Sequence, residues 1–325
     1  MMARSAAPDV STSPASVPPS PRRGGGLGLR GGHRVADLVG VVPPLALYCV
    51  FIIGPLIVAV LLSFTSWNGL GTLHWAGGSN WSEFFRDPVA RTSVVVTAKV
   101  IVLSYVVQTP ISIALGLFTA GRQRYRSVYA TLFVLPLLMS TAGIALLWES
   151  FLDPTFGALT SLSNSSHLSF LNQNWLGDPR LTLYVVIAII AWQFIPFHTL
   201  LYAVGRRQIP AVLYEAATID GASAWQMFWR VTVPQLRYTI VTSGILMIVG
   251  SLTYFDIIYI MTSGGPGYTT RVLSYDMYVV AIQQDQYGYG SVLAVVLGVI
   301  GIAVAVGLAR FSGFASMASQ QEGAA

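Results

Sequence analysis

An acidic residue lies inside an apolar run in the last third of the chain, with aromatic residues close to it. Asp256 is two residues after Tyr254 and three before Tyr259, so on a helix Asp256 and Tyr259 share one face. Trp192 and Gln193 form a second polar and aromatic pair in another apolar run. Carboxylates and amides hydrogen-bond hydroxyl groups, and aromatic faces pack against the C–H groups of sugars. These five residues are therefore predicted to line the path of a polar solute.

The sequence carries no recognisable catalytic or metal-binding pattern. The histidines are dispersed, without metal-ligand spacing, at His33, His74, His167 and His198. No nucleophile and base occur together, so no catalytic residue and no metal site is predicted. An intramembrane enzyme or signalling subunit with Asp256 and His198 as a proton-transfer pair is the enzymatic alternative, and the lack of an acid/base cluster on one face argues against it. The single lysine, Lys99, precedes Val100, whereas a P-loop needs Gly-Lys-Ser/Thr, so the chain itself lacks a standard ATP site.

The composition of the chain is that of a membrane protein. Of its 325 residues 54% are hydrophobic and 10% are charged, with a mean hydropathy of +0.64, against about a quarter charged in soluble domains. Apolar runs of about 20 residues are long enough to cross a bilayer as helices. The predicted spans are Val39–Phe64, Ser93–Ala120, Tyr129–Trp148, Leu181–Val204, Ile240–Thr262 and Ser291–Phe311. The predicted fold is an all-α polytopic membrane protein with six transmembrane helices.

Arginines set the predicted orientation, since cytoplasmic loops are rich in Lys and Arg. With the N-terminus inside, most arginines fall in cytoplasmic segments, and those outside are Arg86, Arg91, Arg180 and Arg271. Both termini are therefore placed in the cytoplasm. Residues 1–36, rich in Ser, Pro and Gly, are predicted to be a disordered cytoplasmic tail. Residues 37–311 form the six-helix transmembrane domain, and 312–325 a cytoplasmic C-terminal tail.

One cytoplasmic connection, residues 205–236, is unusually mixed in composition. Within it, "YEAATIDGASAWQMFWRVTVP" begins at Tyr214. Pro210 suits a first helical turn, Ala211–Ile219 is predicted to be helical, and Asp220-Gly221 to break the chain. A second helix is predicted from about Ser223, as N-cap, to Thr232, ending before Pro234. Its aromatic and apolar face fits either a helix lying on lipid headgroups or insertion into a groove of a cytoplasmic partner.

The segment "EAATIDGASAWQMFWRVTVP" resembles the EAA signature of ABC importer permeases. The matching positions are Glu215, Ala216, Ala217, Asp220, Gly221, Ala222, Phe228 and Pro234. "FDIIYIMTSGGPGYTTR" further resembles the carbohydrate-uptake branch, and the subunit is similar to the larger permease of maltose transporters. The six-span pattern extends this resemblance over about 39–310. The chain lacks the extra N-terminal spans and the large periplasmic domain of the enterobacterial maltose subunit.

The resemblance implies that the two short helices, between the fourth and fifth spans, are coupling helices seated in a cleft of a separate ATPase subunit. Glu215 would pair with a basic group there, and Gly221 would permit the tight turn. The matched alanines have small side chains and would let the ATPase approach this surface closely. Trp225, Phe228 and Trp229 would be hydrophobic anchors. The chain itself is expected to bind no cofactor, and ATP and Mg would be bound by the partner ATPase.

The family also implies the partners and the location. We expect a second homologous permease subunit, two copies of an ABC ATPase subunit, an extracytoplasmic sugar-binding protein and the lipid bilayer, and no nucleic acid. The location is the bacterial cytoplasmic membrane, crossed several times. The implied function is binding-protein-dependent, ATP-driven import of a sugar or oligosaccharide. Another solute, such as a glycerol phosphate, is the alternative within this class. Independently of the solute, the alternative for Asp256 is that it pairs with an arginine of the second permease instead of lining the path.

Overall fold

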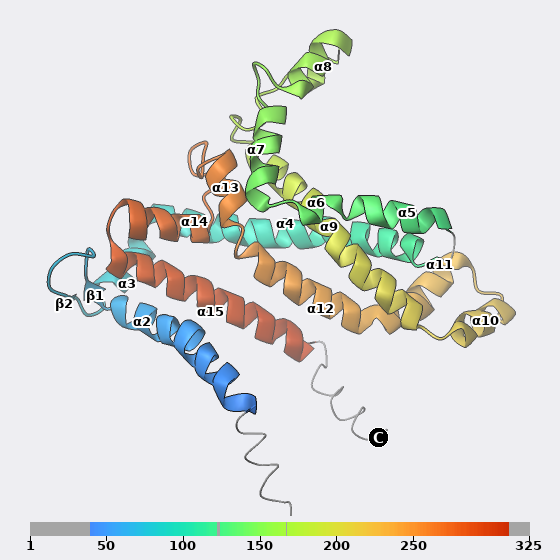
Figure 1. Cartoon of the computed structure of the whole chain (residues 1–325), viewed down its shortest axis with the longest axis horizontal. Coiled ribbons are helices and arrows are strands. Elements are labelled where there is room, and N and C mark those ends of the chain that lie inside the picture. Colours follow the sequence, from blue (N-terminus) through green and yellow to red (C-terminus); the bar gives the residue numbers. More distant parts are fainter. Residues whose placement is uncertain (1–39, 122–123, 167, 312–325) are drawn as a thin grey trace, which may run out of the picture. The chain divides into compact units, whose positions relative to one another are not determined.

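The computed structural model describes residues 40–121, 124–166 and 168–311 (Figure 1). The predicted tails, 1–36 and 312–325, lie outside these residues. The chain divides into two compact units, up to Gly54 and from Pro55 onward, and each is described by itself.

The first unit contains a helix with an entirely apolar surface. Its last residues, Cys49–Ile53, form a π-helical turn, η1. Val50 and Phe51 are 64% and 71% exposed, and no residue of η1 is buried. Exposed apolar side chains of this kind suit a lipid environment.

From the second unit's start onward, the chain is almost wholly helical and carries one short hairpin (Figure 1). In chain order the elements are α2 (Gly54–Leu62), β1 (Thr65–Ser66), β2 (His74–Trp75), α3 (Ser79–Arg86), α4 (Pro88–Thr119), α5 (Arg124–Phe133), α6 (Leu135–Leu138), α7 (Thr141–Phe151), α8 (Ala158–Ser166), η2 (Ser169–Leu171), α9 (Thr182–Gln208), α10 (Ala211–Ile219), α11 (Ala224–Met227), η3 (Phe228–Thr232), α12 (Val233–Ser251), α13 (Phe255–Met261), α14 (Leu273–Tyr278), η4 (Val279–Gln283) and α15 (Tyr287–Phe311).

Among the described residues, five helical segments are long and apolar enough to cross a membrane. They are Gly40–Leu62, Pro88–Thr119, Thr182–Gln208, Ala224–Ser251 and Tyr287–Leu308. The all-α, multi-span prediction is confirmed, while the expectation of six uninterrupted spans is not met by this set.

The predicted third span, Tyr129–Trp148, is divided into α5, α6 and α7. Pro136 lies in the first turn of α6 and has no N–H to continue the preceding helix. Ser140 is extended, with φ −65° and ψ 143°, and its hydroxyl accepts a hydrogen bond from Gly143 N at 3.1 Å. This residue therefore caps a new helix, α7, in the middle of the apolar run.

The predicted fifth span, Ile240–Thr262, is also interrupted. The helix begins earlier, continues to Ser251, and resumes as α13 at Phe255. The Ser251 hydroxyl donates to Met247 O and the Thr253 hydroxyl to Gly250 O, both at 2.8 Å. Hydroxyls that hydrogen-bond the preceding turn compete with the backbone ladder and bend helices.

The long helices α4 and α9 lie side by side and run parallel. Near one end, the Ser112 hydroxyl donates to Ile195 O at 3.4 Å, and a Cβ on Gly116 would lie 2.6 Å from the Cβ of Tyr202. Residue numbers thus increase together along both helices. Pro196 lies inside α9, which continues through it as a single helix.

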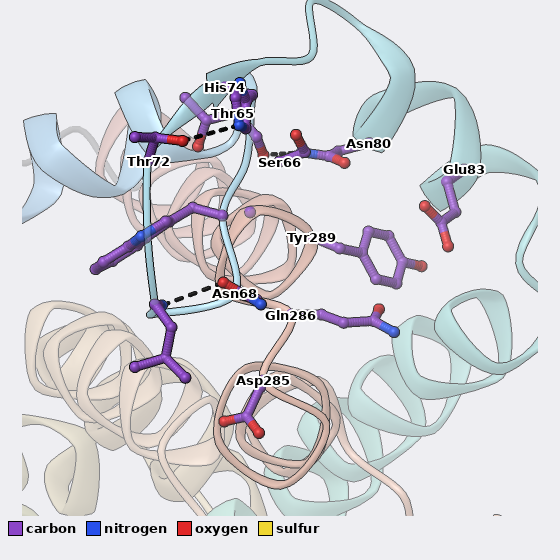
Figure 2. A pocket seen from close by; sticks show the side chains of 13 residues that line it. Thr65, Ser66, Asn68, Thr72, His74, Asn80, Glu83, Asp285, Gln286 and Tyr289 are labelled. Atoms are coloured by element: carbon purple, nitrogen blue, oxygen red, sulfur yellow. Dashed lines mark hydrogen bonds between the residues drawn. The ribbon is translucent and has the colours of Figure 1, made fainter.

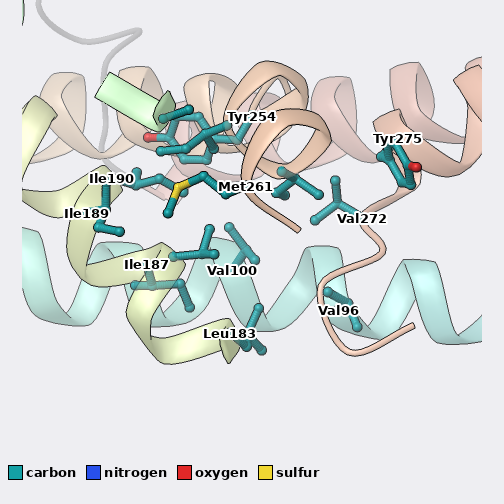
Figure 3. Packing of buried hydrophobic residues seen from close by; sticks show 14 of the residues in the cluster. Val96, Val100, Leu183, Ile187, Ile189, Ile190, Tyr254, Met261, Val272 and Tyr275 are labelled. Atoms are coloured by element: carbon teal, nitrogen blue, oxygen red, sulfur yellow. The ribbon is translucent and has the colours of Figure 1, made fainter. Parts of the chain in front are cut away.

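The main hydrophobic core joins α7 and α13 to the α4–α9 pair (Figure 3). Val100 of α4, Ile187 and Ile190 of α9, and Met261 of α13 are all buried there. The core therefore fixes the short helix after the break in the fifth predicted span against two spanning helices.

At the Pro88 end of α4, the hairpin and α3 pack against α15. The strands are antiparallel, with Thr65 opposite Trp75. Asn80 Nδ2 donates to Ser63 O at 3.0 Å and to Thr65 O at 2.8 Å. Tyr289 OH donates to Asp87 Oδ2 at 2.7 Å, while Asp87 Oδ1 accepts from Val89 N and caps α4.

Candidate functional site

The connection predicted to hold coupling helices is a well-formed helical hairpin. Its first arm, α10, ends at Ile219, and Gly221 has a left-handed φ of +72°. Ala222 N donates to Ala217 O at 2.9 Å, and Gly221 N donates to Thr218 O at 3.0 Å. These two bonds are those of a Schellman motif, which explains why a glycine is required at this position. The predicted break at this glycine is confirmed.

The second arm begins where it was predicted but does not end there. Ser223 and Gln226 form a capping box: Gln226 N donates to the Ser223 hydroxyl at 3.3 Å, and Ser223 N to Gln226 Oε1 at 2.8 Å. The prediction that this helix stops before Pro234 is wrong. A π-helical turn, η3, carries the helix into α12, with Val233 N donating to Phe228 O. Because Pro234 then lies in the first turn of α12, its missing N–H does not end the helix.

One tyrosine braces the first arm of the hairpin against its two neighbours. The Tyr214 hydroxyl lies 2.9 Å from the Thr232 hydroxyl of the π-helical turn. On its face, the Arg206 guanidinium of α9 stands 3.9 Å from the ring centroid. These contacts join α10 to α9 and to the π-helical turn η3, which continues into α12.

Most of the predicted coupling residues are exposed. Glu215, Ala216, Asp220, Gly221 and Pro234 lie at the surface, and Ala217, Ala222 and Phe228 are half-buried.

Aromatic side chains provide an apolar patch on the hairpin. Trp225 and Trp229 are 69% and 51% exposed, and their rings meet at 5.6 Å. Phe228 contacts both rings, at 6.1 and 5.0 Å. Adjacent apolar side chains on α10 are also exposed, with Ile219 86% accessible. An apolar patch of this kind, unpaired within the described chain, is typical of a surface that binds a partner or a membrane.

The structure places two predicted solute-path residues next to α7. Trp192 lies 5.6 Å from Trp148, ring to ring, in a T-shaped contact. Gln193 is buried, and its Nε2 donates to the Thr141 hydroxyl at 3.3 Å. Within the described part of the chain, Trp148 Nε1 and Gln193 Oε1 are buried without hydrogen-bond partners. Buried polar atoms without partners are rare and often mark a ligand or water site.

The other three predicted solute-path residues lie at or after the break in the fifth predicted span. Tyr254 is buried against Phe194 of α9, at 5.5 Å between ring centroids. Asp256 is exposed on the first turn of α13. Tyr259 is 40% exposed and stacks on Phe255 at 5.4 Å.

An aromatic cluster surrounds Tyr259, and the sequence did not predict it. Tyr275 and Tyr278 of α14 contact Tyr259 at 6.2 and 5.5 Å, and both also contact Phe255. Tyr275 and Tyr278 alternate with polar residues and lie outside the predicted spans. The sequence therefore gave no reason to place them beside Tyr259. The five predicted residues therefore come from α9 and from the α13 region, each held by different neighbours.

His198, the alternative proton-transfer partner of Asp256, is engaged elsewhere. Its Nδ1 lies 2.8 Å from the Ser243 hydroxyl of α12. Among the described residues, no three of His, Cys, Asp and Glu come together as a metal site would require.

A buried ion pair fastens the loop after α13 to α4. Arg271 Nη2 and Nε lie 2.6 and 2.7 Å from Asp276 Oδ1, and the Ser93 hydroxyl donates to Asp276 Oδ2 at 3.0 Å. Thr97 of α4 accepts a hydrogen bond from Leu273 N at 2.8 Å. Burial raises the pKa of Asp276 above its ordinary value, against the opposing effect of the Arg271 guanidinium and the Ser93 hydroxyl. Of the groups that favour the ionised carboxylate, Arg271 has the largest effect.

A polar pocket lies beside the β1–β2 hairpin, and its residues were also not predicted (Figure 2). Its volume is about 570 Å³. Glu83 of α3 and Asp285 supply carboxylates, and Asn68, His74 and Gln286 supply further polar groups. These residues come from two distant parts of the sequence, 65–83 and 285–289, so no local spacing indicated them.

Comparison with known proteins assigns the family. Residues 31–313 match the family described as binding-protein-dependent transport system inner membrane component. The chain belongs to this family. It is therefore an ABC transporter permease, a multi-pass component of the cytoplasmic membrane and not an enzyme.

Named relatives of the permease occur in archaea and bacteria. A probable ABC transporter permease protein of Pyrococcus horikoshii is 33% identical over 269 residues, covering 81% of this chain and 91% of that protein. The trehalose/maltose transport system permease protein of Thermococcus litoralis is 31% identical over 211 residues, 64% of this chain and 70% of that protein. The multiple sugar-binding transport system permease protein of Streptococcus mutans is 29% identical over 265 residues, 80% and 89% of the two chains.

Solved structures share the fold of the permease. A bacterial ABC transporter involved in the import of the acidic polysaccharide alginate matches with a TM-score of 0.76 and 21% identity, over 86% of this chain and 96% of that chain. The bacterial alginate ABC transporter in complex with an alginate pentasaccharide-bound periplasmic protein matches with a TM-score of 0.74 and 21% identity, over 87% and 95%.

Proposed function

We propose that this permease carries a sugar or oligosaccharide across the cytoplasmic membrane in a binding-protein-dependent importer whose ATP hydrolysis occurs in a separate subunit. The observation that carries the proposal is the exposed hairpin of α10 and α11, built on a left-handed Gly221 at the centre of the EAA signature. The names of the Thermococcus litoralis and Streptococcus mutans relatives support a carbohydrate substrate.

The proposed topology keeps six crossings with both termini in the cytoplasm. Support comes from α4 and α9, which run parallel in contact with each other. The chain leaves α4 at Thr119 and must return to the opposite end before it enters α9 at Thr182. Segments α5 to α7 would make this return crossing, interrupted at Pro136 and Ser140. In this topology 1–36 and 312–325 are cytoplasmic tails of a six-helix domain, 37–311.

In the proposed mechanism, the hairpin seats in a cleft of the ATPase subunit. Glu215 is exposed and available for a basic group there, and Trp225 supplies an exposed apolar anchor. When two ATPase subunits close on ATP, each would move as a rigid body together with the permease hairpin seated in its cleft. The contacts of Tyr214 with Arg206 and Thr232 then carry the motion into the spanning helices α9 and α12. This chain needs no cofactor for that role, since ATP and Mg would be held by the ATPase.

The proposed solute path runs past α7, α9 and α13. Trp192 and Trp148 offer aromatic faces, and Trp148 Nε1 and Gln193 Oε1 offer a donor and an acceptor that lack partners in the described chain. A sugar hydroxyl satisfies both kinds of group. Asp256 is exposed and equally suited to a sugar or to an arginine of the second permease.

The remaining partners follow from the family. A second permease would complete the membrane domain, two ATPase copies would drive it, and an extracytoplasmic binding protein would deliver the solute. The pocket beside the β1–β2 hairpin lies at the Pro88 end of α4, opposite the coupling hairpin, where that binding protein would dock. Another solute, such as a glycerol phosphate, remains the alternative within the class.

The test is ATP-driven uptake into vesicles that contain the permease with its partner subunits. Radiolabelled oligosaccharides and glycerol 3-phosphate are supplied together with the binding protein. Uptake of an oligosaccharide that needs ATP inside the vesicle is expected. Uptake of glycerol 3-phosphate alone would replace the sugar assignment, and ATP-independent uptake would contradict the importer mechanism.

A further inference from the structure

A basic pocket of about 550 Å³ lies between α4, the start of α9 and the turn at 267–269. We define it by its three cations, Arg91, Lys99 and Arg180, and by the two tyrosines beside them, Tyr184 and Tyr268. Lys99 is the single lysine of the chain. Three positive side chains from two parts of the sequence converge here, in a protein that has few charges.

No carboxylate of the described residues neutralises these cations. Within the residues that the structure describes, no carboxylate lies within ion-pair distance of any of the three, and the lining contains no acidic residue. Asp178 is near in sequence, but its Oδ1 accepts from Arg180 N and caps that turn. Arg271 beside the pocket is already paired with Asp276. The pocket therefore has a net positive charge that an anion would neutralise.

The floor of the basic pocket is apolar. Val95, Val96 and Leu183 line it together with the cations. Below it, one face of α4 stays apolar and exposed, with Val102 and Val106 57% and 59% accessible. A ligand with an anionic group and an apolar chain would complement both the cations and this apolar face.

The depth of the pocket matches a membrane surface. At 1.5 Å per residue, the 32 residues of α4 extend about 48 Å, roughly 18 Å more than a ~30 Å hydrocarbon core. We place the membrane boundary at the far end of α4 beside the charged Arg207 guanidinium, which contacts Thr119 O, so that the excess length lies mainly at the Pro88 end. Lys99, about 16 Å along the helix, then lies at the boundary between headgroups and acyl chains, where α9 also begins.

The turn that closes the pocket is strained. Tyr268 has a φ of +68°, a left-handed conformation that is costly for a bulky side chain. Its ring is 48% exposed, with the Arg271 guanidinium 5.2 Å from its centroid. Strained residues of this kind are concentrated where a ligand is held, and tyrosine is typical of the membrane interface.

We propose that the basic pocket binds the phosphate of an anionic phospholipid, whose acyl chain follows the apolar face of α4. The chemistry is a phosphate held by two guanidiniums and an ammonium, with tyrosine hydroxyls at its rim. The proposal depends on the membrane location of the permease and on no particular solute. In the topology proposed above, this lipid belongs to the outer leaflet.

The test is native mass spectrometry of the full-length permease in its assembled transporter, titrated with phosphatidylglycerol, phosphatidylcholine or inorganic phosphate. We expect phosphatidylglycerol to bind at least tenfold tighter than phosphatidylcholine. The triple variant Arg91→Gln/Lys99→Gln/Arg180→Gln removes three charges, each worth about fivefold near a membrane surface, so binding should weaken on the order of 100-fold. Lys99→Arg keeps the charge and should retain binding.

The matched control is Arg86→Gln, which removes an exposed arginine from α3, outside the pocket. It should bind phosphatidylglycerol like the wild type, and elution volume and melting temperature report on folding for every variant. Equal phosphatidylglycerol binding by the triple variant would overturn the proposal. A wild-type protein without lipid preference would also overturn it, and this result is expected if a partner's carboxylates fill the pocket. Full competition of inorganic phosphate with the lipid would overturn it as well.

Discussion

Gly221 offers the sharpest perturbation of the coupling hairpin. Its φ of +72° is left-handed, and a Cβ added there would meet nothing within 4 Å. Gly221→Ala therefore changes backbone strain without a clash inside this chain. A left-handed alanine costs about 1–2 kcal/mol, which shifts the balance between this turn and a relaxed one by roughly five- to thirtyfold.

We expect this strain to reduce transport more than stability. ATP-driven uptake by Gly221→Ala should fall at least ~fivefold if coupling needs the observed turn. The melting temperature in detergent should shift by only about 2–4 °C, since the cost is local and small beside the total. Gly221→Asn should retain most uptake, because asparagine tolerates the left-handed region.

The matched control for this experiment is Gly77→Ala. Gly77 also has a left-handed φ, +59°, and open space around its Cβ position, but it precedes α3. This variant should transport normally at equal expression. Wild-type uptake by Gly221→Ala would refute the reasoning, as would an equal loss in Gly77→Ala.

Three other predictions concern stability and bracing. Arg271→Gln should destabilise the fold by about 3–5 kcal/mol because it leaves Asp276 buried and unpaired. Since burial raises the pKa of Asp276, this loss should grow as pH rises through that pKa, and adding Asp276→Asn should restore stability; an equally unstable double variant in thermal melts would contradict this. Gly116→Ala should cost about 1–3 kcal/mol by overpacking, whereas Gly307→Ala, in open space, should be neutral in the same melts. Tyr214→Phe should lose about 1 kcal/mol with its hydroxyl contact, and unchanged hydrogen-exchange protection of α10 would count against bracing.

Local signals were sufficient for the hairpin. Gly221 and Ser223 were identified from residue type alone, because a left-handed cap and an N-cap depend on one or two neighbouring backbone groups. The end of the second arm was misjudged at Pro234. A proline ends a helix only where its missing N–H and its ring conflict with the preceding turn, and the π-helical turn before it removes that conflict.

The third and fifth spans were predicted less well, because averaging hydropathy over a window hides short breaks within an apolar run. Pro136 and Ser140 were visible in the sequence, but the surrounding apolar residues kept the third run looking continuous. The break after Ser251 contains no proline, and the Ser251 and Thr253 hydroxyls hydrogen-bond the preceding turn there.

The sequence indicated the solute-path residues but not their neighbours from other helices. Spacing along one helix pairs Asp256 with Tyr259, yet Tyr259 packs with Phe255 and with two tyrosines of α14. Contacts between Trp192 and Trp148, or among the three cations of the basic pocket, depend on how α4, α7 and α9 pack. Such tertiary contacts cannot be read from spacing within one segment.

Photo-crosslinking from the coupling hairpin tests the central claim most directly. A photoreactive amino acid replaces the exposed Ala216 of α10 in the assembled transporter, with the exposed Phe156, between α7 and α8, as the control position. The account predicts a crosslink from position 216 to the ATPase subunit, with a yield that changes when ATP is added, and none from position 156. Crosslinks from position 216 to lipid alone would instead place this hairpin on the membrane surface and contradict the coupling role.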